Sequence, residues 1–586
     1  MATKLPEVDI LLVGFGWTGA ILAQELTEAG LNVLALERGA WRDTPTDFAP
    51  TFIQDELRYY YRHALFQEPM RETLTFRNSP DQTALPMRRL GSFLPATGVG
   101  GAGIHWNGQT WRFLPSDFVA RSHNEQRYGP LADGLTVQDW GVTYDELEPY
   151  YDKFEYLCGI SGKAGNIQGK IQPGGNPFEG ARQRDYPNPP MEMTYAPTIF
   201  AQAAEKVGVH PFPCPSANMS RPYTNPLGVQ LGPCTYCGFC EKYACGNYSK
   251  SSPQTTILPV VMRKPNFTLK TECEVLTINR DSTGRRATGV TYVDAQGREW
   301  EQPADIVVLT AFILNNVQLL LTSGIGKPYD PGTGQGTIGK NYAYQIVSSV
   351  NVFYDDKLMN PFIGAGALGV GVDDWNGDNF DHSGLGFIGG GYLACWTTNG
   401  RPIETHPVPK GTPMWGAKFK KAVRDSYLRT ATVSTHGAVM SHRNNHLDLD
   451  PTYRDVHGRP LLRMTFDYHD NEHKMSDYLT AKATEIAKAM GGREVDAKPR
   501  TGPYSIVPYQ TTHNTGGAIM GTDPRSSAVN RYLQSWDVPN LFVMGASAFP
   551  QNPGYNPTGT VGALTYWAAA AIRNQYLKHP GPLVQA

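Results

Sequence analysis

The chain has 586 residues, of which 40% are hydrophobic and 18% are charged, and its formal net charge is −2. This composition is typical of a globular protein with two or more domains and excludes a disordered or fibrous chain. The small negative charge argues against a nucleic-acid partner, which requires a basic surface. No apolar run reaches the roughly eighteen residues of a membrane span, and the opening MATKLPEVD lacks the features of a secretory signal.

The amino end predicts a dinucleotide-binding unit. Residues 8–13 form a short apolar strand that ends directly in the glycine-rich turn GFGWTG, residues 20–29 have helical spacing, and residues 33–36 form a second strand. Glu37 follows that strand, where its carboxylate can accept hydrogen bonds from ribose hydroxyls. An ordinary βαβ unit with convenient glycines is the alternative, but the complete pattern favours a pyrophosphate at the helix N-terminus. The turn contributes Gly14, Gly16, Trp17, Thr18 and Gly19.

The segments that follow are less regular. Residues 41–90, which include the tyrosines 59–61, are polar and aromatic and predict a helix and an excursion from the main fold. A second glycine-rich turn, GVGGAGIHWNGQTWR, comes next. Residues 140–159 predict an amphipathic helix with Thr143 as its N-cap. Residues 160–230 are rich in Pro, Gly and Asn and predict a loop-dominated insertion.

The α/β pattern returns in the second half of the chain. Residues 266–279 and 287–293 alternate like the strands of a hairpin. Residues 304–310 predict a buried strand that leads into a helix over 312–323, and Gly324 ends that helix. The remaining predicted elements are a sheet over residues 341–470 that forms a cavity wall, helices over 473–490 and 560–576, and a strand over 540–546.

Four of the eight cysteines lie within twelve residues: Cys234, Cys237, Cys240 and Cys245. Four thiolates at this density can hold an iron–sulfur cluster or a tetrahedral zinc ion. Zinc sites usually divide their cysteines into two distant pairs, so the spacing favours iron–sulfur, with zinc and plain thiols as alternatives. The other cysteines are interpreted as ordinary buried residues: Cys158, Cys214, Cys273 and Cys395.

The order of motifs resembles the glucose-methanol-choline (GMC) family of flavin oxidoreductases. The N-terminal fingerprint, GVGGAGIHWNG, LLLTSGIG, the segment around His513 and the closing NPGYNPTGTVGAL carry this resemblance over most of the chain. The phrases VGFGWTGAI, GVGGAGIHW, GPCTYCGFC, SGIGKPYDP and PYTNPLG are similar to the flavoprotein subunits of membrane-associated bacterial gluconate dehydrogenases. The sequence departs from the family pattern at Gly545, where an acidic residue is usual, and in the altered signature AFILNNVQLLL.

The resemblance implies an α/β fold (α+β overall), with a Rossmann-like FAD-binding domain and a discontinuous, sheet-containing substrate domain. The FAD-binding domain is expected to comprise residues 1–120, 235–340 and 505–586, with a cluster-binding segment at 232–247. The substrate-binding or cap domain is expected to comprise residues 121–234 and 341–504.

The resemblance also implies FAD, bound covalently through His105, whose counterpart in related enzymes is joined to the flavin 8α-carbon. From the residues alone, His105 can also be a catalytic base or a structural hydrogen-bonding residue. At the cysteines it implies a [3Fe–4S] cluster, which needs only three of the four thiols. The further residues expected to contact FAD are Arg38, Gly98, Gly100, Gly101, Gly103, Trp106, Asn107, Val275, Ala311, Gly545, Ala546, Pro557 and Thr558.

His513, in TTHNTGG, and Asn556, in GYNPTGT, fall on the positions of the family's catalytic pair. An imidazole that titrates near neutrality can take the hydroxyl proton of a carbinol as hydride leaves the same carbon for flavin N5. Asn556 would donate a hydrogen bond to the developing alkoxide oxygen.

The expected reaction is oxidation of D-gluconate at C2 to 2-keto-D-gluconate, with electrons leaving through the cluster. The alternatives are another sugar or polyol (fructose, sorbitol, 2-keto-gluconate or a glucoside), a soluble FAD sugar oxidase with a structural zinc, and a non-enzymatic electron relay. A substrate carboxylate should meet an arginine or a lysine. The candidates for that role are Arg112, Arg221, Lys250 and Arg443.

The resemblance further implies two partners, a small subunit with a twin-arginine export signal and a membrane-anchored multihaem cytochrome c. We therefore expect the chain on the periplasmic side of the bacterial inner membrane. It would be exported as a passenger of the small subunit and attached to the membrane through its partners.

Overall fold

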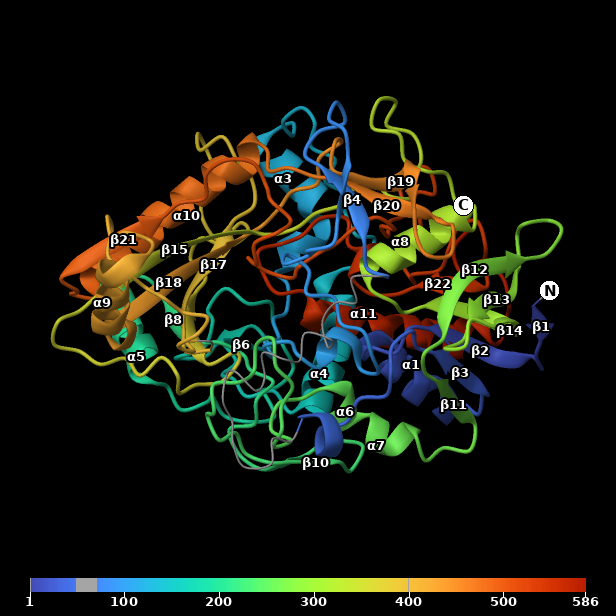
Figure 1. Cartoon of the computed structure of the whole chain (residues 1–586), viewed down its shortest axis with the longest axis horizontal. Coiled ribbons are helices and arrows are strands. Elements are labelled where there is room, and N and C mark those ends of the chain that lie inside the picture. The colour runs from blue at the N-terminus through green and yellow to red at the C-terminus, as the bar shows by residue number, and fades with distance from the viewer. Residues whose placement is uncertain (1, 49–70, 399, 586) are drawn as a thin grey trace.

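The computed structural model describes residues 2–48, 71–398 and 400–585. Its larger sheets have eight, six and four strands. The eight-stranded sheet, which carries the N-terminus, and the six-stranded sheet lie at opposite ends of the molecule (Figure 1). One continuous hydrophobic core runs through both, from Ile10 in the first sheet to Val433 in the second.

The predicted dinucleotide-binding unit is confirmed. β2 (Val8–Val13) leads into α1 (Trp17–Glu28), and β3 (Val33–Leu36) returns to pair with β2 in parallel. Gly14 turns the chain with a φ of +101°, which strongly favours glycine. A Cβ added at Gly19 would lie 2.5 Å from the carbonyl oxygen of Gly14, so only glycine allows α1 to pack this closely.

β14 (Glu299–Leu309) joins the two halves of the eight-stranded sheet. Its second half pairs in parallel with β2 and with β22 (Leu541–Val543), and its first half pairs antiparallel with β13 (Ala287–Val293). β12 (Glu274–Arg280) completes the predicted hairpin with β13. β11 (Phe267–Lys270) was wrongly predicted as part of that hairpin and pairs in parallel with β3. The cause is a left-handed turn at Glu272, φ +55°, which redirects the chain between β11 and β12.

The predicted sheet over residues 341–470 forms as two sheets instead of one. Most of its strands join an antiparallel six-stranded sheet, covered by α10 (Asp470–Ala489), as the contact of Gly437 with Met475 shows. In spatial order these strands are β21 (Glu494–Lys498), β15 (Ile346–Phe353), β18 (Thr430–Gly437), β17 (Gly391–Trp396), β16 (Gly369–Val372) and β8 (Pro211–Pro213).

The other two strands, β19 (His446–Arg454) and β20 (Pro460–Thr465), find partners far upstream. β20 pairs in parallel with β4 (Leu74–Arg77), which pairs with β5 (Leu85–Met87). The helix predicted within residues 41–90 is therefore replaced by strands in its second half. The tyrosines 59–61 lie outside the described residues.

Helices connect and cover these sheets. α4 (Tyr144–Cys158) begins at the predicted Thr143 cap, whose side chain accepts from the backbone N–H of Glu146. It packs closely on α11 (Thr558–Ala571), because a Cβ at Gly562 would lie 2.5 Å from the ring of Phe154. Among the described helices, none is long and apolar enough to cross a membrane.

The remaining elements are short or lie at the periphery. They are β1 (Thr3–Lys4), α3 (Ala120–Tyr128), β6 (Asn166–Ile167), β7 (Lys170–Ile171), α5 (Tyr195–Lys206), β9 (Tyr223–Thr224), β10 (Gln230–Leu231), α6 (Pro253–Thr256), α7 (Leu258–Val261), α8 (Ile313–Thr322) and α9 (Gly416–Ser426). α8 is the helix that was predicted to follow the strand now called β14, and Gly324 ends it with a φ of +65°.

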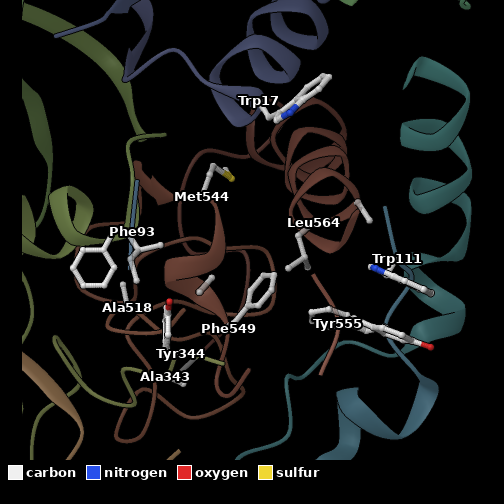
Figure 2. Packing of buried hydrophobic residues seen from close by; sticks show 14 of the residues in the cluster. Trp17, Phe93, Trp111, Ala343, Tyr344, Ala518, Met544, Phe549, Tyr555 and Leu564 are labelled. Carbon is white, nitrogen blue, oxygen red and sulfur yellow. The ribbon is translucent and has the colours of Figure 1, made fainter. Parts of the chain in front are cut away.

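Segments from both ends of the sequence meet in the core between the sheets. Figure 2 shows Trp111 and Tyr555 lying against one another, and their rings are stacked at 4.7 Å with an interplanar angle of 7°. Phe549 lies deeper in the same cluster and meets the ring of Phe113 edge-on. Aromatic pairs of this kind hold the C-terminal loop against the segment that carries the second glycine-rich turn.

A buried ion cluster lies beside α4. Arg112 donates to both carboxylate oxygens of Glu155, at 2.8 Å each, and to Glu148 at 3.0 Å. Arg182 donates to the same Glu155 carboxylate. Both guanidinium groups are almost fully buried, so the cluster depends on Glu155 for charge balance.

We predict that Glu155→Gln lowers the free energy of unfolding by about 3–5 kcal/mol, because it leaves two buried guanidinium groups without their shared carboxylate. Glu125→Gln is the matched control, since Glu125 pairs with Arg121 on an exposed helix face and should cost less than about 1 kcal/mol. Urea unfolding of the two variants measures the difference. Equal costs for both variants would contradict this role of Glu155.

Candidate active site

A cavity of about 590 Å³ lies between the eight-stranded and the six-stranded sheets. It receives the C-terminal ends of β2, β3 and β14 from one side and one face of β18 from the other. The predicted site residues in its wall are Gly14, Gly16, Trp17, Thr18, Glu37, Arg38, Gly101, Gly103, His105, Trp106, Asn107, Val275, Ala311, His513, Gly545, Ala546, Asn556, Pro557 and Thr558.

Three predicted cofactor residues lie behind this wall instead of in it. Gly19 packs α1 on the turn, as described above. The N–H of Gly100 donates to the carbonyl of Phe15 at 2.7 Å, and a Cβ at Gly100 would lie 2.2 Å from the side chain of Gln254. Gly98 has a φ of +140° and packs against Gly39, where a Cβ would lie 2.1 Å from the Gly98 nitrogen. These glycines hold the two glycine-rich turns together.

The dinucleotide end of the cavity has the features of a phosphate-binding turn. Gly16 is the N-cap of α1 and no side chain caps the helix, so the first backbone N–H groups point to the cavity. The indole Nε1 of Trp17 is buried and has no hydrogen-bond acceptor among the described residues. A Cβ added at Gly16 would meet nothing closer than 3.9 Å, which leaves room for a group lying against the backbone. This end of the cavity therefore fits a pyrophosphate.

Glu37 closes the same end. Its carboxylate accepts from the backbone N–H of Phe15 at 2.9 Å and of Gly39 at 2.8 Å. Burial raises the pKa of Glu37, while these two donors act in the opposite direction. The carboxylate is thus fixed in the cavity wall, in the position from which it can accept from ribose hydroxyls.

The opposite end of the cavity, called the ring end here because it is the part that can accept the flat ring of a cofactor, contains the second glycine-rich turn and the loop after β22. Gly545 has a φ of +86°, and a Cβ there would find nothing within 4 Å. Gly545, the position at which the sequence departs from the family pattern, therefore has empty space beside its Cα atom. His105 is buried, and burial together with the positive charge of Lys250 lowers its pKa to about 3. The imidazole is neutral. This is the form whose nitrogen lone pair can act as a nucleophile and form a covalent bond to a cofactor ring.

The structure brings His513 and Asn556 together, although they are 43 residues apart. The side-chain nitrogen Nδ2 of Asn556 lies 2.9 Å from Nε2 of His513. On the other side of the ring, Nδ1 of His513 lies 2.5 Å from Oε1 of Gln345. The carbonyl of Gly554 accepts from Nε2 of Gln345, so the amide oxygen of Gln345 must face His513. This arrangement places the proton of His513 on Nδ1 and leaves Nε2 as an acceptor, which in this structure faces the side-chain amide of Asn556.

Asn556 is oriented in a similar way. The hydroxyl of Tyr392 donates to Oδ1 of Asn556 at 2.7 Å, so the NH2 group of Asn556 faces His513 and the cavity. Tyr392 in turn stacks on His436 with ring centroids 4.9 Å apart. The Asn556 amide therefore donates to Nε2 of His513, and both side chains line the same cavity.

His436 is a second imidazole in the cavity wall, and the sequence analysis missed it. Its Nδ1 lies 3.2 Å from Oε1 of Gln345, and burial lowers its pKa to about 4. Burial and the neighbouring His436 lower the pKa of His513 to about 3. The pKa of His513 in this structure is therefore below the near-neutral value expected from the sequence, because desolvation penalises the charged imidazole.

The wall opposite the dinucleotide end is rich in hydroxyl groups. Alternate residues of β18 face the cavity, namely Thr430, Thr432, Ser434 and His436. The period-2 pattern TATVSTHG is the signal that could have identified this face, since alternate residues of a strand share one side. Thr397 and Thr398 extend the hydroxyl wall from the end of β17.

None of the four cations proposed for a substrate carboxylate lines the cavity. Arg112 belongs to the buried ion cluster, Arg221 donates to Asn188 and to the Pro187 carbonyl, and Arg443 pairs with Asp133 at the surface. Lys250 is fully buried outside the wall. These candidates are wrong because their partners lie elsewhere. Among the described residues, the lysines and arginines in the wall are Arg38, Lys242 and Arg459.

The four clustered cysteines lie next to the His105 segment, behind the cavity wall. The backbone N–H of Lys242, in the same segment, donates to the carbonyl of His105 at 3.0 Å. All eight cysteines are free thiols. Those outside the cluster are buried, as predicted: Cys158, Cys214, Cys273 and Cys395.

Several N–H groups point at the sulfur atoms of the cluster. The backbone N–H of Tyr236 lies 3.4 Å from Cys234 Sγ, and the side-chain amide of Asn218 lies 3.5 Å from Cys240 Sγ. Donors of this kind stabilise thiolates in iron–sulfur sites. Among the residues that the structure describes, no three His, Cys, Asp or Glu side chains are arranged to hold a single metal ion.

The profile of GMC oxidoreductases matches residues 140–347 with its N-terminal part and residues 441–565 with its C-terminal part. The chain belongs to the GMC oxidoreductase family. It is therefore an FAD-dependent oxidoreductase that acts on CH–OH donors. The residues in the cavity wall agree with this cofactor, since they offer a phosphate-binding turn, a fixed ribose acceptor and an open ring end.

Curated relatives cover nearly the whole of this GMC oxidoreductase. The gluconate 2-dehydrogenase flavoprotein of Pantoea cypripedii is 53% identical over 594 residues, covering 100% of this chain and 97% of its own length. The fructose dehydrogenase large subunit of Gluconobacter japonicus is 25% identical, with 98% and 99% covered. Among solved structures, pyridoxine 4-oxidase from Mesorbium loti matches with a TM-score of 0.58 at 16% identity, covering 98% of this chain and 100% of its own. That match shows the shared fold.

The buried neutral histidines of this GMC oxidoreductase make its stability depend on pH. The native pKa of His436 is about 4, below the unfolded value of roughly 6.5, so the unfolded chain binds more protons below neutrality. Stability is therefore lost as the pH falls from 7 toward 4. We predict that His436→Gln reduces the stability lost between pH 7 and pH 5 by about 2 kcal/mol.

Urea unfolding at the two pH values measures this effect. His579→Gln is the control, because His579 lies exposed near the C-terminus. It should leave the pH dependence as in the unsubstituted protein. If His436→Gln and His579→Gln show the same loss on acidification, the buried neutral state of His436 is disproved.

Proposed function

We propose that this chain is the flavoprotein subunit of a dehydrogenase that oxidises D-gluconate at C2 to 2-keto-D-gluconate. The observation that carries the proposal is the His513–Asn556 pair, which faces the same cavity as the dinucleotide turn. The identity of 53% to a gluconate 2-dehydrogenase flavoprotein over the full length supports the substrate. Electrons would leave through an iron–sulfur cluster to a cytochrome c subunit.

The protein's own residues account for the proton transfer. Nε2 of His513 takes the proton of the substrate hydroxyl, because Gln345 keeps the other ring nitrogen protonated. Asn556 donates to Nε2 in this structure. On binding, the substrate hydroxyl would replace it as the partner of Nε2, and the amide would then donate to the oxygen that becomes negative. Bound FAD supplies the acceptor for the hydride that leaves the carbinol carbon. The desolvation that lowers the pKa of His513 and of His436 would also limit the access of bulk water to this step.

His105 is proposed to bind the flavin covalently. It lines the ring end of the cavity, and its depressed pKa keeps the imidazole neutral and nucleophilic at physiological pH. Acid precipitation of the purified protein tests this proposal, since a covalent flavin stays with the pellet. Release of all flavin into the supernatant would leave His105 as a packing residue.

The cysteine segment is proposed to hold the iron–sulfur cluster, of the [3Fe–4S] type. Four thiols of mixed burial lie within this segment, and N–H donors point at Cys234 and Cys240. A bound cluster supplies one-electron transfer. The segment adjoins the His105 loop, since the N–H of Lys242 donates to the His105 carbonyl at 3.0 Å, and this contact supports the proposal.

The substrate carboxylate is proposed to meet Lys242. Arg38 pairs with Glu72, and Arg459 pairs with Glu274 beside the predicted cofactor residue Val275. Lys242 lies in another part of the cavity wall. Its ammonium is 4.2 Å from the ring centre of Tyr509, which is in the loop that leads to His513. Its nearest carboxylate oxygen, on Glu404, is 3.7 Å away. The hydroxyl wall of β18 suits the remaining polyol chain.

The proposed partners are a small subunit with a twin-arginine signal and a membrane-anchored multihaem cytochrome c. A relative described as a large subunit and another described as a flavoprotein support a heteromeric enzyme. The proposed location is the periplasmic side of the inner membrane. Activity in a periplasmic fraction only when the small subunit is co-expressed would support it, and activity without that subunit would overturn it.

We predict that His513→Ala slows anaerobic flavin reduction by D-gluconate by about 10²–10⁴-fold, because the general base is lost. Gln345→Leu should also slow it, since His513 then lacks the acceptor that fixes its tautomer. Stopped-flow bleaching of the flavin absorbance measures both rates at equal flavin content. Unchanged bleaching in His513→Ala would make the chain an electron relay instead of the oxidising subunit.

A panel of gluconate, ketogluconates, polyols and aldoses tests the substrate in the same assay. We predict that gluconate bleaches the flavin fastest. We also predict that Lys242→Met raises its KM by at least about tenfold with little change in the limiting rate, since a charge-assisted hydrogen bond is lost. Lys578→Met, at an exposed position near the C-terminus, is the control. The gluconate assignment fails if only uncharged sugars bleach the flavin.

A further inference from the structure

His436 lines the cavity beside the proposed base, but the proposed mechanism gives its imidazole no contact with the substrate. It is the last of the β18 residues that face the cavity, and its ring centre lies 6.5 Å from that of His513. Its side chain is only partly covered by the protein, so some of the imidazole surface is accessible in the cavity wall. A second imidazole at this distance is close enough to contact the same substrate molecule as His513.

The position of the proton on His436 is determined by Gln345. The amide nitrogen of Gln345 donates to the Gly554 carbonyl, which turns the oxygen Oε1 toward both imidazoles. Nδ1 of His513 lies 2.5 Å from this oxygen, and Nδ1 of His436 lies 3.2 Å from it. An amide oxygen has two lone pairs and can accept from both rings, but it has no proton to donate. Each neutral imidazole therefore carries its proton on Nδ1 and its lone pair on Nε2.

Nε2 of His436 is consequently an acceptor to which the protein supplies no donor in the part of the chain that the structure describes. Nε2 of His513 differs, because the amide of Asn556 lies 2.9 Å from it. A ligand that carries a hydroxyl group can donate to Nε2 of His436. A carbonyl or ether oxygen at the same place cannot, because it has no proton to give. An acceptor of this kind therefore distinguishes a hydroxyl from its oxidised or deoxygenated counterpart.

Two contacts hold this acceptor in a fixed orientation. The ring of His436 stacks on Tyr392, with ring centroids 4.9 Å apart and an interplanar angle of 16°, and its Nδ1 is bound to Gln345. The hydroxyl groups on the same face of β18 are less selective, because a hydroxyl can rotate and act as donor or acceptor. That of Thr432, for example, donates to Asn351 at 2.9 Å. His436 thus presents a preorganised acceptor to the substrate.

We propose that His436 determines substrate specificity by accepting a hydrogen bond at Nε2 from a second substrate hydroxyl, one or two carbons away from the carbinol that is oxidised. This inference rests on the proposed function, in which His513 takes the proton of that carbinol. Two imidazoles with ring centres 6.5 Å apart can accept from hydroxyls on neighbouring or next-nearest carbons. Together they recognise a diol unit of a polyol chain. In D-gluconate oxidised at C2, the second hydroxyl is the one on C3 or on C4.

Deoxy analogues of gluconate test this contact in the purified protein with its bound flavin. The bimolecular rate constant of anaerobic flavin bleaching is measured for D-gluconate and for its 3-deoxy, 4-deoxy and 6-deoxy analogues. His436→Phe removes both ring nitrogens but keeps a ring that can stack on Tyr392. His436→Asn keeps a donor for Gln345 and has no atom at the position of Nε2, so it replaces the phenylalanine variant if that variant does not fold. His436→Gln keeps a group that can accept at that position, and His579→Phe, at an exposed position, is the matched control.

We expect loss of the hydroxyl at C3 or at C4 to slow the unsubstituted protein and His579→Phe at least about fivefold, because the acceptor at Nε2 is then left unpaired. The 6-deoxy analogue should react as fast as gluconate. In His436→Phe and His436→Asn the deoxy analogue and gluconate should react at equal rates, and His436→Gln should restore part of the difference. Any effect of the missing hydroxyl on intrinsic reactivity is common to all variants and cancels when they are compared.

Two results would overturn the inference. One is the same rate ratio between gluconate and the deoxy analogue in the unsubstituted protein and in the variants without Nε2, which would leave His436 a packing role. The other is an unsubstituted protein that does not discriminate against either the 3-deoxy or the 4-deoxy analogue. If another polyol bleaches the flavin and gluconate does not, the proposed substrate is wrong, and the deoxy analogues of that polyol decide the role of His436 in the same way. Bleaching by no polyol would refute both proposals.

Discussion

The parallel pairing of three strands is the constraint on which the site depends. β14 lies between β2 and β22, and Leu309 is in register with Val13 on one side and Val543 on the other. The carboxyl ends of parallel strands meet at one edge of a sheet, where crevices for ligands form. The glycine turn after β2, Ala311 after β14 and the loop at Gly545 after β22 therefore share one cavity. The hydroxyl of Thr310 donates to the Gly14 carbonyl at 2.6 Å and fixes this edge further.

The chemistry at the other end of the cavity depends on amide orientation. An imidazole in a closed pocket can carry its proton on either nitrogen, and only one choice leaves a base toward the substrate. The Gly554 carbonyl determines how Gln345 is turned, and Gln345 determines which nitrogen of His513 is free. Tyr392 does the same for Asn556. The reactive pair is thus oriented by Gln345 and Tyr392, which belong to the region of the six-stranded sheet, and by the C-terminal loop that contains Gly554.

The parts of the fold that could be predicted are those whose determinants are local in the sequence. The dinucleotide unit and α4 carry their strands, turns and caps within a few residues, so periodicity and capping rules located them. β11 and β4 could not be assigned in the same way, because their partners lie more than two hundred residues away in one case and nearly four hundred in the other. His513 and Asn556 were found through the motif order. Gln345 was missed because a buried glutamine in a strand-like segment carries no signal of which group it faces.

Burial explains why the ionisable residues behave differently from their sequence-based interpretation. The same loss of water lowers the pKa of His105 and of His513 to about 3, which keeps both imidazoles neutral in a cavity that must accept a proton and a flat ring. Lys250, beside the second glycine-rich turn, is fully buried as well. Burial lowers its pKa, while the neighbouring cysteines act in the opposite direction. The charge of Lys250 in turn contributes to the low pKa of His105, so the behaviour of each group depends on how the fold encloses its neighbour.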